Sequence, residues 1–400
     1  MKSYEGKIDI NKVFTLQPAR PVTYFGVGAI SKTEDIVKSL RSRGQGKILV
    51  VTDKIAYKAC GAWDIVEPVL NKEAEGFEHY SGVRPNPTYD NCEEAARMGE
   101  KMKATSIMAI GGGSAMDTAK TAAVLMHHPG KKSADFYEKG ELVTGALPIV
   151  AINTSHGTGS ETDAFAVAQS DGHDKPAINS PHVYPTYAIE DPQLTASMPL
   201  NQTIATSIDA MNHATEAATT ITTNPYSILL AQDAIRLVAT YLPQAIVEPN
   251  NLTPRYWLMY ASALAGISFD IGLLHITHAM EHAMSAINSE VAHGDGLGIL
   301  MPAMIQEIYH AVPEVLADLY RPIVPELHGL PGEGGYAAER IREWFAKVGQ
   351  STSMEGYFTE KDVSNLVDMT KKSMLANMLL PLAPIPVDDQ VLYRIFKESL

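Results

Sequence analysis

The chain has 400 residues, of which 45% are hydrophobic and 20% are charged, so it is long enough for two globular domains of ordinary composition. Its net charge of −14 argues against binding to the phosphate backbone of a nucleic acid, which requires a basic face. The two cysteines, Cys60 and Cys92, are too few for a cysteine-based zinc site or a disulfide framework.

The N-terminal segment MKSYEGKIDINKV carries charges and lacks the apolar core of a secretory signal. No apolar run in the sequence reaches the roughly 18 residues that a membrane-spanning helix needs. We therefore expect a protein of the reducing cytoplasm that binds neither a membrane nor a nucleic acid.

Residues 1–195 alternate short β-branched runs with amphipathic stretches such as 30–44 and 89–104. The expected strands are 22–28, 47–53, 106–113, 147–153 and 164–169. Strands that alternate with helices in this way predict βαβ units, and hence an α/β domain with a mostly parallel sheet.

The sequence pattern changes after DPQLTASMP (191–199), where strand-like runs become rare. Long helical patterns then cover 202–221, 225–246, 253–270, 272–288, 335–349, 360–377 and 388–398. We predict a domain boundary near 195, with an all-α domain over 196–400.

Two glycine-rich loops follow expected strands. SIMAIGGGSAMDTAK (106–120) joins a strand to a helix through three glycines, which fits either a phosphate at a helix N-terminus or a tight turn without a ligand. NTSHGTGSE (153–161) follows the next strand. Two such loops would flank one crevice at the carboxyl ends of the sheet, which favours a nucleotide.

Two further features near strand ends have a structural and a functional interpretation. GVGAIS (26–31) is close to a dinucleotide fingerprint but lacks its third glycine, and we interpret it as a structural turn. Asp53 ends a strand, where an acid either binds an adenosine ribose and repels a 2′-phosphate or caps the next helix.

A group of metal-binding residue types lies in the helical half. Asp209 and His213 have the i, i+4 spacing that places both on one helix face. HITHAMEHAMSAINSEVAHG (275–294) then contains four of the 13 histidines. A carboxylate and several imidazoles on neighbouring helices predict a divalent metal, Zn²⁺ or Fe²⁺, but the spacing does not select which clustered histidines bind it.

These motifs resemble the iron-containing (group III) alcohol dehydrogenases. AIGGGSAMD, HGTGSE, IDAMNHATEA and HAMEHAMSA…AHG occur in that family's order and spacing, and the resemblance runs over essentially the whole chain. It implies a Rossmann-like α/β dinucleotide-binding domain, an all-α metal-binding domain of the dehydroquinate-synthase-like fold, and an active site in the cleft.

The resemblance also assigns the histidines and their aspartate. It implies that Asp209, His213, His278 and His293 bind the metal, as Fe²⁺ with Zn²⁺ possible. It places His282 near the nicotinamide as the catalytic histidine. His275 has no counterpart among the family's ligands and is expected to be structural.

The positions that match the family's NAD(H) site are Asp53, Asn86, Gly112, Gly113, Ser114, Asp117, Thr154, Ser155, Thr158 and Lys175. Among them, the two glycines with Ser114 would hold the pyrophosphate, and Asp53 would select NAD rather than NADP. The positions that match the substrate pocket are Asp163, Phe165 and Phe269.

The sequence also departs from the family's pattern. The spacer from His282 to His293 is one residue longer than in the lactaldehyde-reductase-like members, and His156 stands where many members have a small residue. The segment LLPLAPIPVDDQ (379–390) lacks the Asn-Pro-Arg that many members carry. That segment can border the substrate pocket in this family. The identity of the alcohol therefore cannot be inferred from the substrate of any one member.

The expected function is the NAD(H)-dependent interconversion of a short-chain primary alcohol and its aldehyde, by a homodimer or larger homo-oligomer. A glycerol-dehydrogenase-like enzyme or a sulfoacetaldehyde-type reductase would share the scaffold. A dehydroquinate-synthase-like lyase would need a basic cluster for its anionic substrate, which these motifs lack. The two glycine loops argue against a metal-dependent hydrolase, and turnover of NADH would exclude a non-catalytic nucleotide-binding protein.

Overall fold

A computed structural model describes residues 21–170 and 174–400; residues 1–20, which contain the N-terminal segment discussed above, and 171–173 lie outside it. The chain divides into two compact units. The α/β unit contains 21–198 and Asn250–Met259, and the helical unit contains Pro199–Pro249 and Tyr260–Leu400.

Among the described residues, the α/β unit contains a six-stranded sheet with the order β1-β8-β5-β4-β2-β3. Every neighbouring pair in it is parallel. The strands are β1 (Val22–Phe25), β2 (Lys47–Thr52), β3 (Gly76–Tyr80), β4 (Ser106–Gly111), β5 (Ile149–Asn153) and β8 (Tyr187–Glu190). Their carboxyl ends lie at one edge, so that β2, β4 and β5 bring Asp53 and both glycine loops to the same side.

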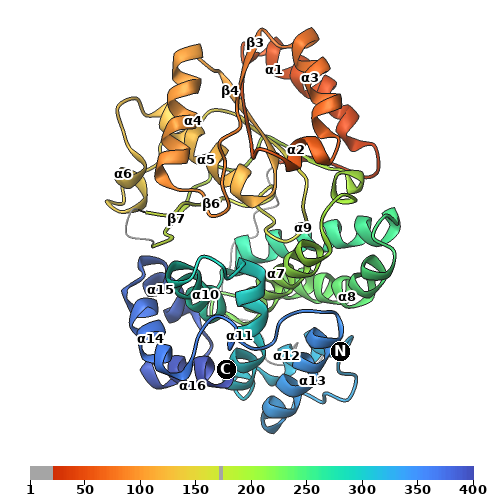
Figure 1. Ribbon diagram of the computed structural model, residues 1–400, viewed down its shortest axis with the longest axis vertical. Coiled ribbons are helices and arrows are strands. Elements are labelled where there is room, and N and C mark those ends of the chain that lie inside the picture. Colours follow the sequence, from red (N-terminus) through yellow and green to blue (C-terminus); the bar gives the residue numbers. More distant parts are fainter. Residues whose placement is uncertain (1–20, 171–173) are drawn as a thin grey trace. The chain divides into compact units, whose positions relative to one another are not determined.

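Helices cover both faces of this sheet (Figure 1). One hydrophobic cluster includes α1 (Thr33–Ser42) and α3 (Ala62–Glu73), and the other includes α4 (Tyr89–Met102) and α5 (Gly113–His127). The central strands are therefore buried on both sides, which explains their continuous apolar sequences. The shorter elements are η2 (Ala29–Lys32), α2 (Ala56–Ala59), α6 (Ser133–Tyr137) and η3 (Pro192–Thr195).

The α/β unit differs from the sequence expectation in detail. The predicted strand 164–169 is shorter, and as β6 (Phe165–Val167) it pairs antiparallel with β7 (Ala177–Asn179) outside the main sheet. The predicted strand 22–28 ends at Phe25, because Gly26 and Gly28 turn the chain with φ angles of 133° and 85°. The polar edge strand β3 and the four-residue β8 had too little pattern to be predicted.

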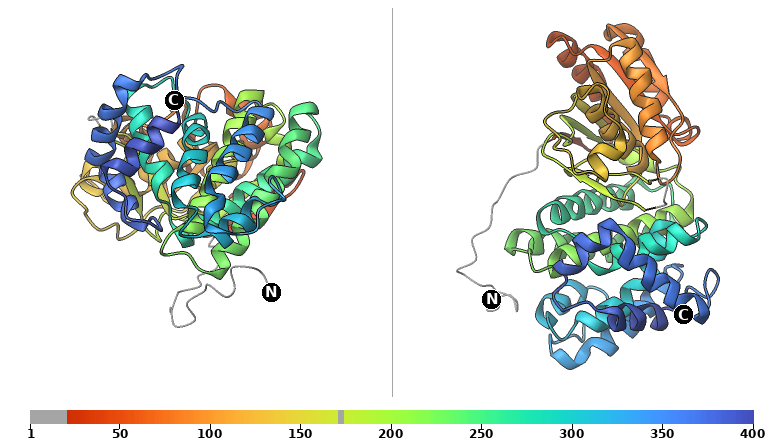
Figure 2. Two further views of the ribbon diagram at one scale, coloured as in Figure 1. Left: turned by 90° about the horizontal axis from the view of Figure 1, so that it is seen from below. Right: turned by 90° about the vertical axis from the view of Figure 1, so that its left-hand side faces the viewer.

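The described part of the helical unit consists of packed helices (Figure 2). They are α7 (Leu200–Thr219), α8 (Pro225–Val247), α10 (Ile276–Ile287), α11 (His293–Ile308), α12 (Pro313–Tyr320), α13 (Gly334–Lys347), α14 (Val363–Lys372), α15 (Met374–Leu379) and α16 (Asp389–Glu398), with η4 (Pro331–Glu333), η5 (Glu360–Asp362) and η6 (Leu380–Leu382). The helix α9 (Leu252–Gly272) begins in the α/β unit and ends in the helical unit. The predicted fold class is confirmed.

Two features of the helical unit were not expected. The sequence pattern did not predict α11 or α12, and α11 contains Gly294, Gly296, Gly298 and Pro302, which lower helix propensity. The predicted helix 360–377 is interrupted at Ser373, whose hydroxyl accepts a hydrogen bond from the Ala376 N–H and so caps α15.

No single helix in the described ranges has both the length and the apolar character to cross a membrane. The helices α9 and α10 meet that test of length and composition only as a pair bent by 106°.

Candidate functional site

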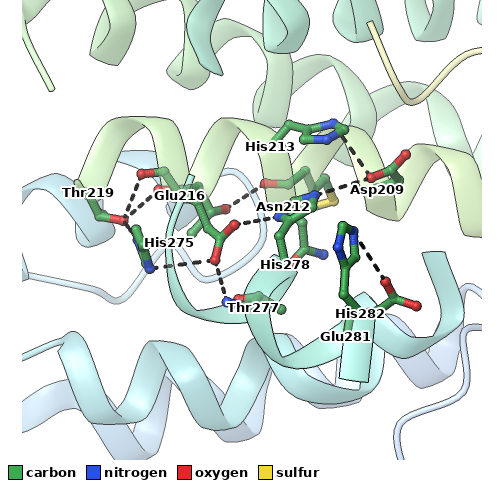
Figure 3. Close-up of polar contacts among 12 residues, drawn as sticks. Asp209, Asn212, His213, Glu216, Thr219, His275, Thr277, His278, Glu281 and His282 are labelled. Atoms are coloured by element: carbon green, nitrogen blue, oxygen red, sulfur yellow. Dashed lines mark hydrogen bonds and ion pairs between the residues drawn. The ribbon is translucent and has the colours of Figure 1, made fainter. Parts of the chain in front are cut away.

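The predicted metal ligands come from three helices of the helical unit. On α7, Asp209, His213 and Glu216 follow one another at i, i+4 and i+7, so they project from one face. Figure 3 shows this face of α7 directed toward His278 and the other labelled residues of the α10 segment. His293 is the first residue of α11.

Three of these side chains direct ligand atoms at one point. Asp209 Oδ1 lies 3.8 Å from His278 Nε2 and 3.8 Å from His293 Nε2. These three ligand atoms all lie within 4.8 Å of one another. A divalent ion at their centre requires only small movements, because ligand bonds of zinc are about 2.0–2.2 Å long.

The burial of this group fits a cation. Within the described part of the chain, Asp209 Oδ1 and His278 Nε2 are buried without a hydrogen-bond partner. Buried polar atoms normally have partners, because an unsatisfied one costs free energy. A carboxylate oxygen and an imidazole nitrogen that point at the same space are satisfied together by a metal ion, so the residues present fit the predicted metal.

His213 lies beside this group. Its Nδ1 is 3.5 Å from Asp209 Oδ1, and its ring stacks on that of His278 with centroids 4.6 Å apart. The other face of the His213 ring contacts Phe269, also at 4.6 Å. Phe269, which was predicted to line the substrate pocket, therefore packs against a predicted ligand.

The predicted catalytic histidine is close to the same cluster. His282 lies one turn after His278 on α10, and its ring centroid is 5.6 Å from that of His293. Its Nε2 is 4.0 Å from Glu281 Oε2. The side chains of His282, His293 and Glu281 form a second group of potential ligand atoms within 4.8 Å.

Two buried glutamates hold the outer nitrogens of the predicted ligands His278 and His293. Glu216 Oε2 accepts a hydrogen bond from His278 Nδ1 at 2.5 Å, and its Oε1 accepts one from the Thr277 N–H. Glu281 Oε2 accepts one from His293 Nδ1. Because a carboxylate can only accept, each bond leaves the Nε2 lone pair of its histidine directed at the metal position.

The charges of the cluster reinforce one another. Burial opposes ionisation of Asp209, but His213, His278 and His293 outweigh it and lower the pKa of the carboxyl to about 2. Burial also opposes ionisation of Glu216, but the attraction of His278 and His275 lowers its pKa to about 2. Burial alone would lower the pKa of His278, yet the two carboxylates raise it to about 9. The site thus stabilises positive charge.

His275 occupies a different place from the ligands. Its Nε2 donates to Thr219 Oγ1 at 2.8 Å, because that hydroxyl itself donates to the Thr215 carbonyl. Burial lowers the pKa of His275 to about 4 although Glu216 Oε1 is 3.5 Å away. The structural role expected for His275 stays a prediction.

Close helix packing brings His293 to the centre. A Cβ at Gly294 would lie 2.1 Å from the Ala205 carbonyl oxygen of α7, which no side chain tolerates. The start of α11 can therefore approach the backbone of α7 only with glycine at this position.

The two glycine loops of the α/β unit meet as predicted from their strands. A Cβ at Gly112 would lie 2.7 Å from Ser155 Oγ, and one at Gly113 would lie 2.6 Å from Thr158 Cγ2. The Thr154 N–H also donates to the Gly111 carbonyl at 3.1 Å. The two loops, here called the cradle, thus pack this closely only because Gly112 and Gly113 lack side chains. They lie next to the N-terminus of α5, whose free N–H groups would suit a pyrophosphate.

Asp53 has the capping role that was considered for it, and its role in cofactor binding stays a prediction. Its Oδ1 accepts the N–H groups of Ile55 at 2.5 Å and Ala56 at 2.6 Å, so it caps the turn into α2. Its Oδ2 points toward the strand that carries the glycine loop, 4.0 Å from the Cβ position of Gly111. The carboxylate is therefore held at the carboxyl ends of β2 and β4, where the order of the strands reverses.

The remaining predicted cofactor residues make contacts within the α/β unit. Lys175 Nζ donates to Asn86 Oδ1 at 3.1 Å, and Asn86 has a left-handed φ of 52°. Asp117 Oδ1 accepts from Ser160 Oγ at 3.0 Å, which links α5 to the second loop. Ser114 is the second residue of α5.

One predicted pocket residue, Asp163, belongs to a buried ion pair, and a second, Phe165, contacts the same lysine through its backbone. Lys120 is fully buried, and its Nζ donates to Asp163 Oδ1 at 2.7 Å and to the carbonyl of Phe165 at 2.7 Å. The Asp163 carboxylate is thus committed to tying the segment before β6 to α5. Its role in lining a substrate pocket stays a prediction.

Sequence reasoning did not identify Glu216, Glu281 or Lys120. The signal was present for the glutamates, because each is a carboxylate among mostly uncharged residues, at helical spacing from a histidine. Only the packing of α7, α10 and α11 shows which histidine each one holds.

Comparisons with known proteins show which family the chain belongs to. The family model for iron-containing alcohol dehydrogenases matches residues 21–192, and the model for the C-terminal domain of that family matches residues 203–400. The chain is 48% identical to a long-chain primary alcohol dehydrogenase of Thermoanaerobacter ethanolicus, over 99% of this chain and 100% of that protein. It is 30% identical to long-chain-alcohol dehydrogenase 1 of Geobacillus thermodenitrificans, over 95% of each chain.

A solved structure shares the fold. The crystal structure of an NADH-dependent butanol dehydrogenase from Thermotoga maritima superposes with a TM-score of 0.87 at 25% identity, covering 97% of this chain and 98% of that one. The resemblance noted in the motifs is thereby confirmed over both halves of the molecule. This chain belongs to the iron-containing alcohol dehydrogenase family.

Proposed function

We propose that the protein is an NAD(H)-dependent oxidoreductase that interconverts a primary alcohol and its aldehyde. The observation that carries this proposal is the convergence of Asp209 Oδ1, His278 Nε2 and His293 Nε2 in a buried cluster. Membership of the family supports it, as do the names of the two similar alcohol dehydrogenases.

Asp209, His278, His293 and, with a small movement of its ring, His213 would hold the metal, as Fe²⁺ or Zn²⁺. The cradle at Gly112 and Gly113, with Ser114, would hold the pyrophosphate. When bound, the metal supplies a Lewis acid for the alcohol or aldehyde oxygen, and the nicotinamide accepts or donates the hydride.

His282 is the residue we assign to proton transfer. It is one helical turn from a ligand, and its side chain is 9% exposed, so it can exchange a proton while water is largely excluded. The domain roles follow from these assignments: residues 1–195 bind NAD(H), and residues 196–400 bind the metal.

The chain length of the substrate is the part of the proposal that needs a broad test. The sequence led us to expect short-chain alcohols, whereas the two similar proteins are named for long-chain alcohols. A homodimer or larger homo-oligomer stays a prediction, which light scattering on the purified protein would test. The cytoplasmic location also stays a prediction.

The decisive experiment follows NADH by its absorbance. Anaerobically purified protein loaded with Fe²⁺ is mixed with NADH and aldehydes from two to sixteen carbons, with Zn²⁺-loaded and chelator-treated protein as controls. We expect metal-dependent loss of NADH with at least one aldehyde. No loss with any aldehyde or metal, and no gain of NADH with the alcohols, would refute the proposal.

A further inference from the structure

Glu281 is a fully buried carboxylate that touches the predicted metal ligand His293 without being assigned to the metal. It lies on α10, and its side chain reaches across to α11. A Cβ at Gly296 of α11 would lie 2.8 Å from Glu281 Cγ and 3.4 Å from Glu281 Oε1. The absence of a side chain at Gly296 therefore leaves the space that Glu281 occupies.

The hydrogen bond fixes the chemical form of His293. The carboxylate oxygen accepts, so the proton of a neutral imidazole resides on Nδ1 and the Nε2 lone pair is free. That Nε2 faces Asp209 Oδ1 at 3.8 Å. The opposite tautomer would place its N–H at the metal position and could not bind an ion.

His293 depends on this contact more than His278 depends on its own glutamate. The side chain of His293 is 31% exposed, whereas that of His278 is 4% exposed and is stacked on His213. Burial and stacking therefore restrain the His278 ring in addition to its bond to Glu216, whereas the more exposed His293 ring has less packing around it. The hydrogen bond to Glu281 restrains the rotation of the His293 ring about its side-chain torsions.

We propose that Glu281 is a positioning residue that fixes the tautomer and the orientation of His293, and thereby raises the affinity of the centre for its metal. This inference rests on the metal site of the proposed function. A carboxylate that served only to fill space between α10 and α11 would stabilise the fold equally with and without metal.

The test measures metal binding directly, with Zn²⁺ as the probe. Full-length wild type, Glu281→Gln and Glu281→Ala are stripped of metal and titrated with Zn²⁺ against a chromogenic chelator. Glu290→Gln is the matched control, because it makes the same charge change at an exposed position three residues before His293. Loss of such a carboxylate partner typically weakens metal binding about 10–100-fold, so we expect roughly tenfold for Gln and up to about a hundredfold for Ala.

A second readout separates positioning from packing. The visible absorption bands of Co²⁺-loaded protein report the geometry of the ligands, and we expect them to change in both Glu281 variants but not in Glu290→Gln. Zn²⁺ affinity within twofold of wild type, with unchanged Co²⁺ bands, would overturn the inference. If Glu281→Ala fails to fold, the isosteric Glu281→Gln decides by the same criterion.

The failure of the inference differs from the failure of the proposed function. If wild type binds no Zn²⁺, or if His293→Ala binds it as wild type does, the metal site itself is wrong and both proposals fall. If His293→Ala loses Zn²⁺ while the Glu281 variants keep it, only the positioning role is wrong.

Discussion

The two units of the molecule build their candidate sites from different parts of the chain. In the α/β unit the cradle is formed by backbone at Gly112 and Gly113, where side chains are absent. In the helical unit the candidate centre is formed by side chains, and the predicted ligands His278 and His293 each donate a hydrogen bond from Nδ1 to a glutamate. The backbone site depends on the absence of side chains at its glycines. The side-chain site depends on the residues that hydrogen-bond its predicted ligands.

This contrast predicts different responses to small changes. Adding one methyl group should damage the cradle, and removing one hydrogen-bond partner should damage the metal centre. The four predictions below test that difference, beginning with the largest effect.

Removal of a ligand should have the greatest consequence. We expect His293→Ala to lose bound metal and at least about 10³-fold in kcat/KM, because a Lewis acid contributes several kcal/mol to the stabilisation of developing charge. Metal content by elemental analysis and the rate of NADH oxidation measure this. His310→Ala, at an exposed histidine just beyond the end of α11, is the control. Full metal content and rate in His293→Ala would disprove the ligand assignment.

A methyl group in the cradle should weaken cofactor binding without removing metal. In Gly113→Ala the new Cβ would meet Thr158 Cγ2 at 2.6 Å and push the two loops apart. We expect the Kd of NADH, measured by its fluorescence, to rise by about tenfold or more, which is about 1.4 kcal/mol. Gly76→Ala, where a Cβ meets nothing within 4 Å, serves as the control. An unchanged Kd would place the pyrophosphate elsewhere.

The charge of Asp53 should affect the choice of cofactor. Asp53→Ser removes the carboxylate but keeps an oxygen that can accept from the Ile55 and Ala56 N–H groups. We expect the ratio of kcat/KM for NADPH to that for NADH to rise by roughly tenfold, because the repulsion of the 2′-phosphate is lost. Steady-state rates with both cofactors give this ratio. An unchanged ratio with retained stability would leave Asp53 only its capping role.

The smallest effect concerns a buried histidine of the α/β unit. Burial and the nearby Arg255 lower the pKa of His156 to about 3, so the unfolded chain takes up a proton near pH 6.5 and the folded chain does not. The free energy of unfolding therefore decreases as the pH falls through 6.5. We expect it to be about 1 kcal/mol lower at pH 6 than at pH 8.

In His156→Asn the free energy of unfolding should change less between pH 8 and pH 6 than in wild type. This expectation holds whatever the absolute stability of the variant. Thermal unfolding of wild type and variant between pH 8 and pH 6 measures the slope, with the exposed His310→Asn as the control. Equal slopes in wild type and His156→Asn would show that the histidine is not held neutral. His278 behaves in the opposite way, because Glu216 and Asp209 outweigh its burial and raise its pKa to about 9.

The sequence predicted the α/β and helical halves because their hydrophobic periods differ. It also predicted the meeting of the two glycine loops, since successive parallel strands end at the same edge of a sheet. It could not predict α11, because Gly294 and Gly296 lower helix propensity. Those glycines become intelligible only against Ala205 and Glu281, which are distant in sequence.

The residues of the candidate metal centre were predictable, but the hydrogen bonds that orient them were not. Helical spacing brought Asp209 and His213 together, and the resemblance selected His278 and His293 from four clustered histidines. The roles of Glu216 and Glu281 depend on how α7, α10 and α11 pack, which no local pattern encodes. The same limit applies to Asp163, whose partner Lys120 lies 43 residues earlier in the chain.

The two contacts of Glu216 link the backbone at the start of α10 to a predicted metal ligand. One carboxylate oxygen takes the Thr277 N–H at the start of α10, and the other takes the His278 imidazole. The first turn of α10 and the orientation of a ligand are therefore held by the same group. We therefore expect the amide hydrogen of Thr277 to exchange with deuterium faster in the metal-free protein than in the metal-loaded protein.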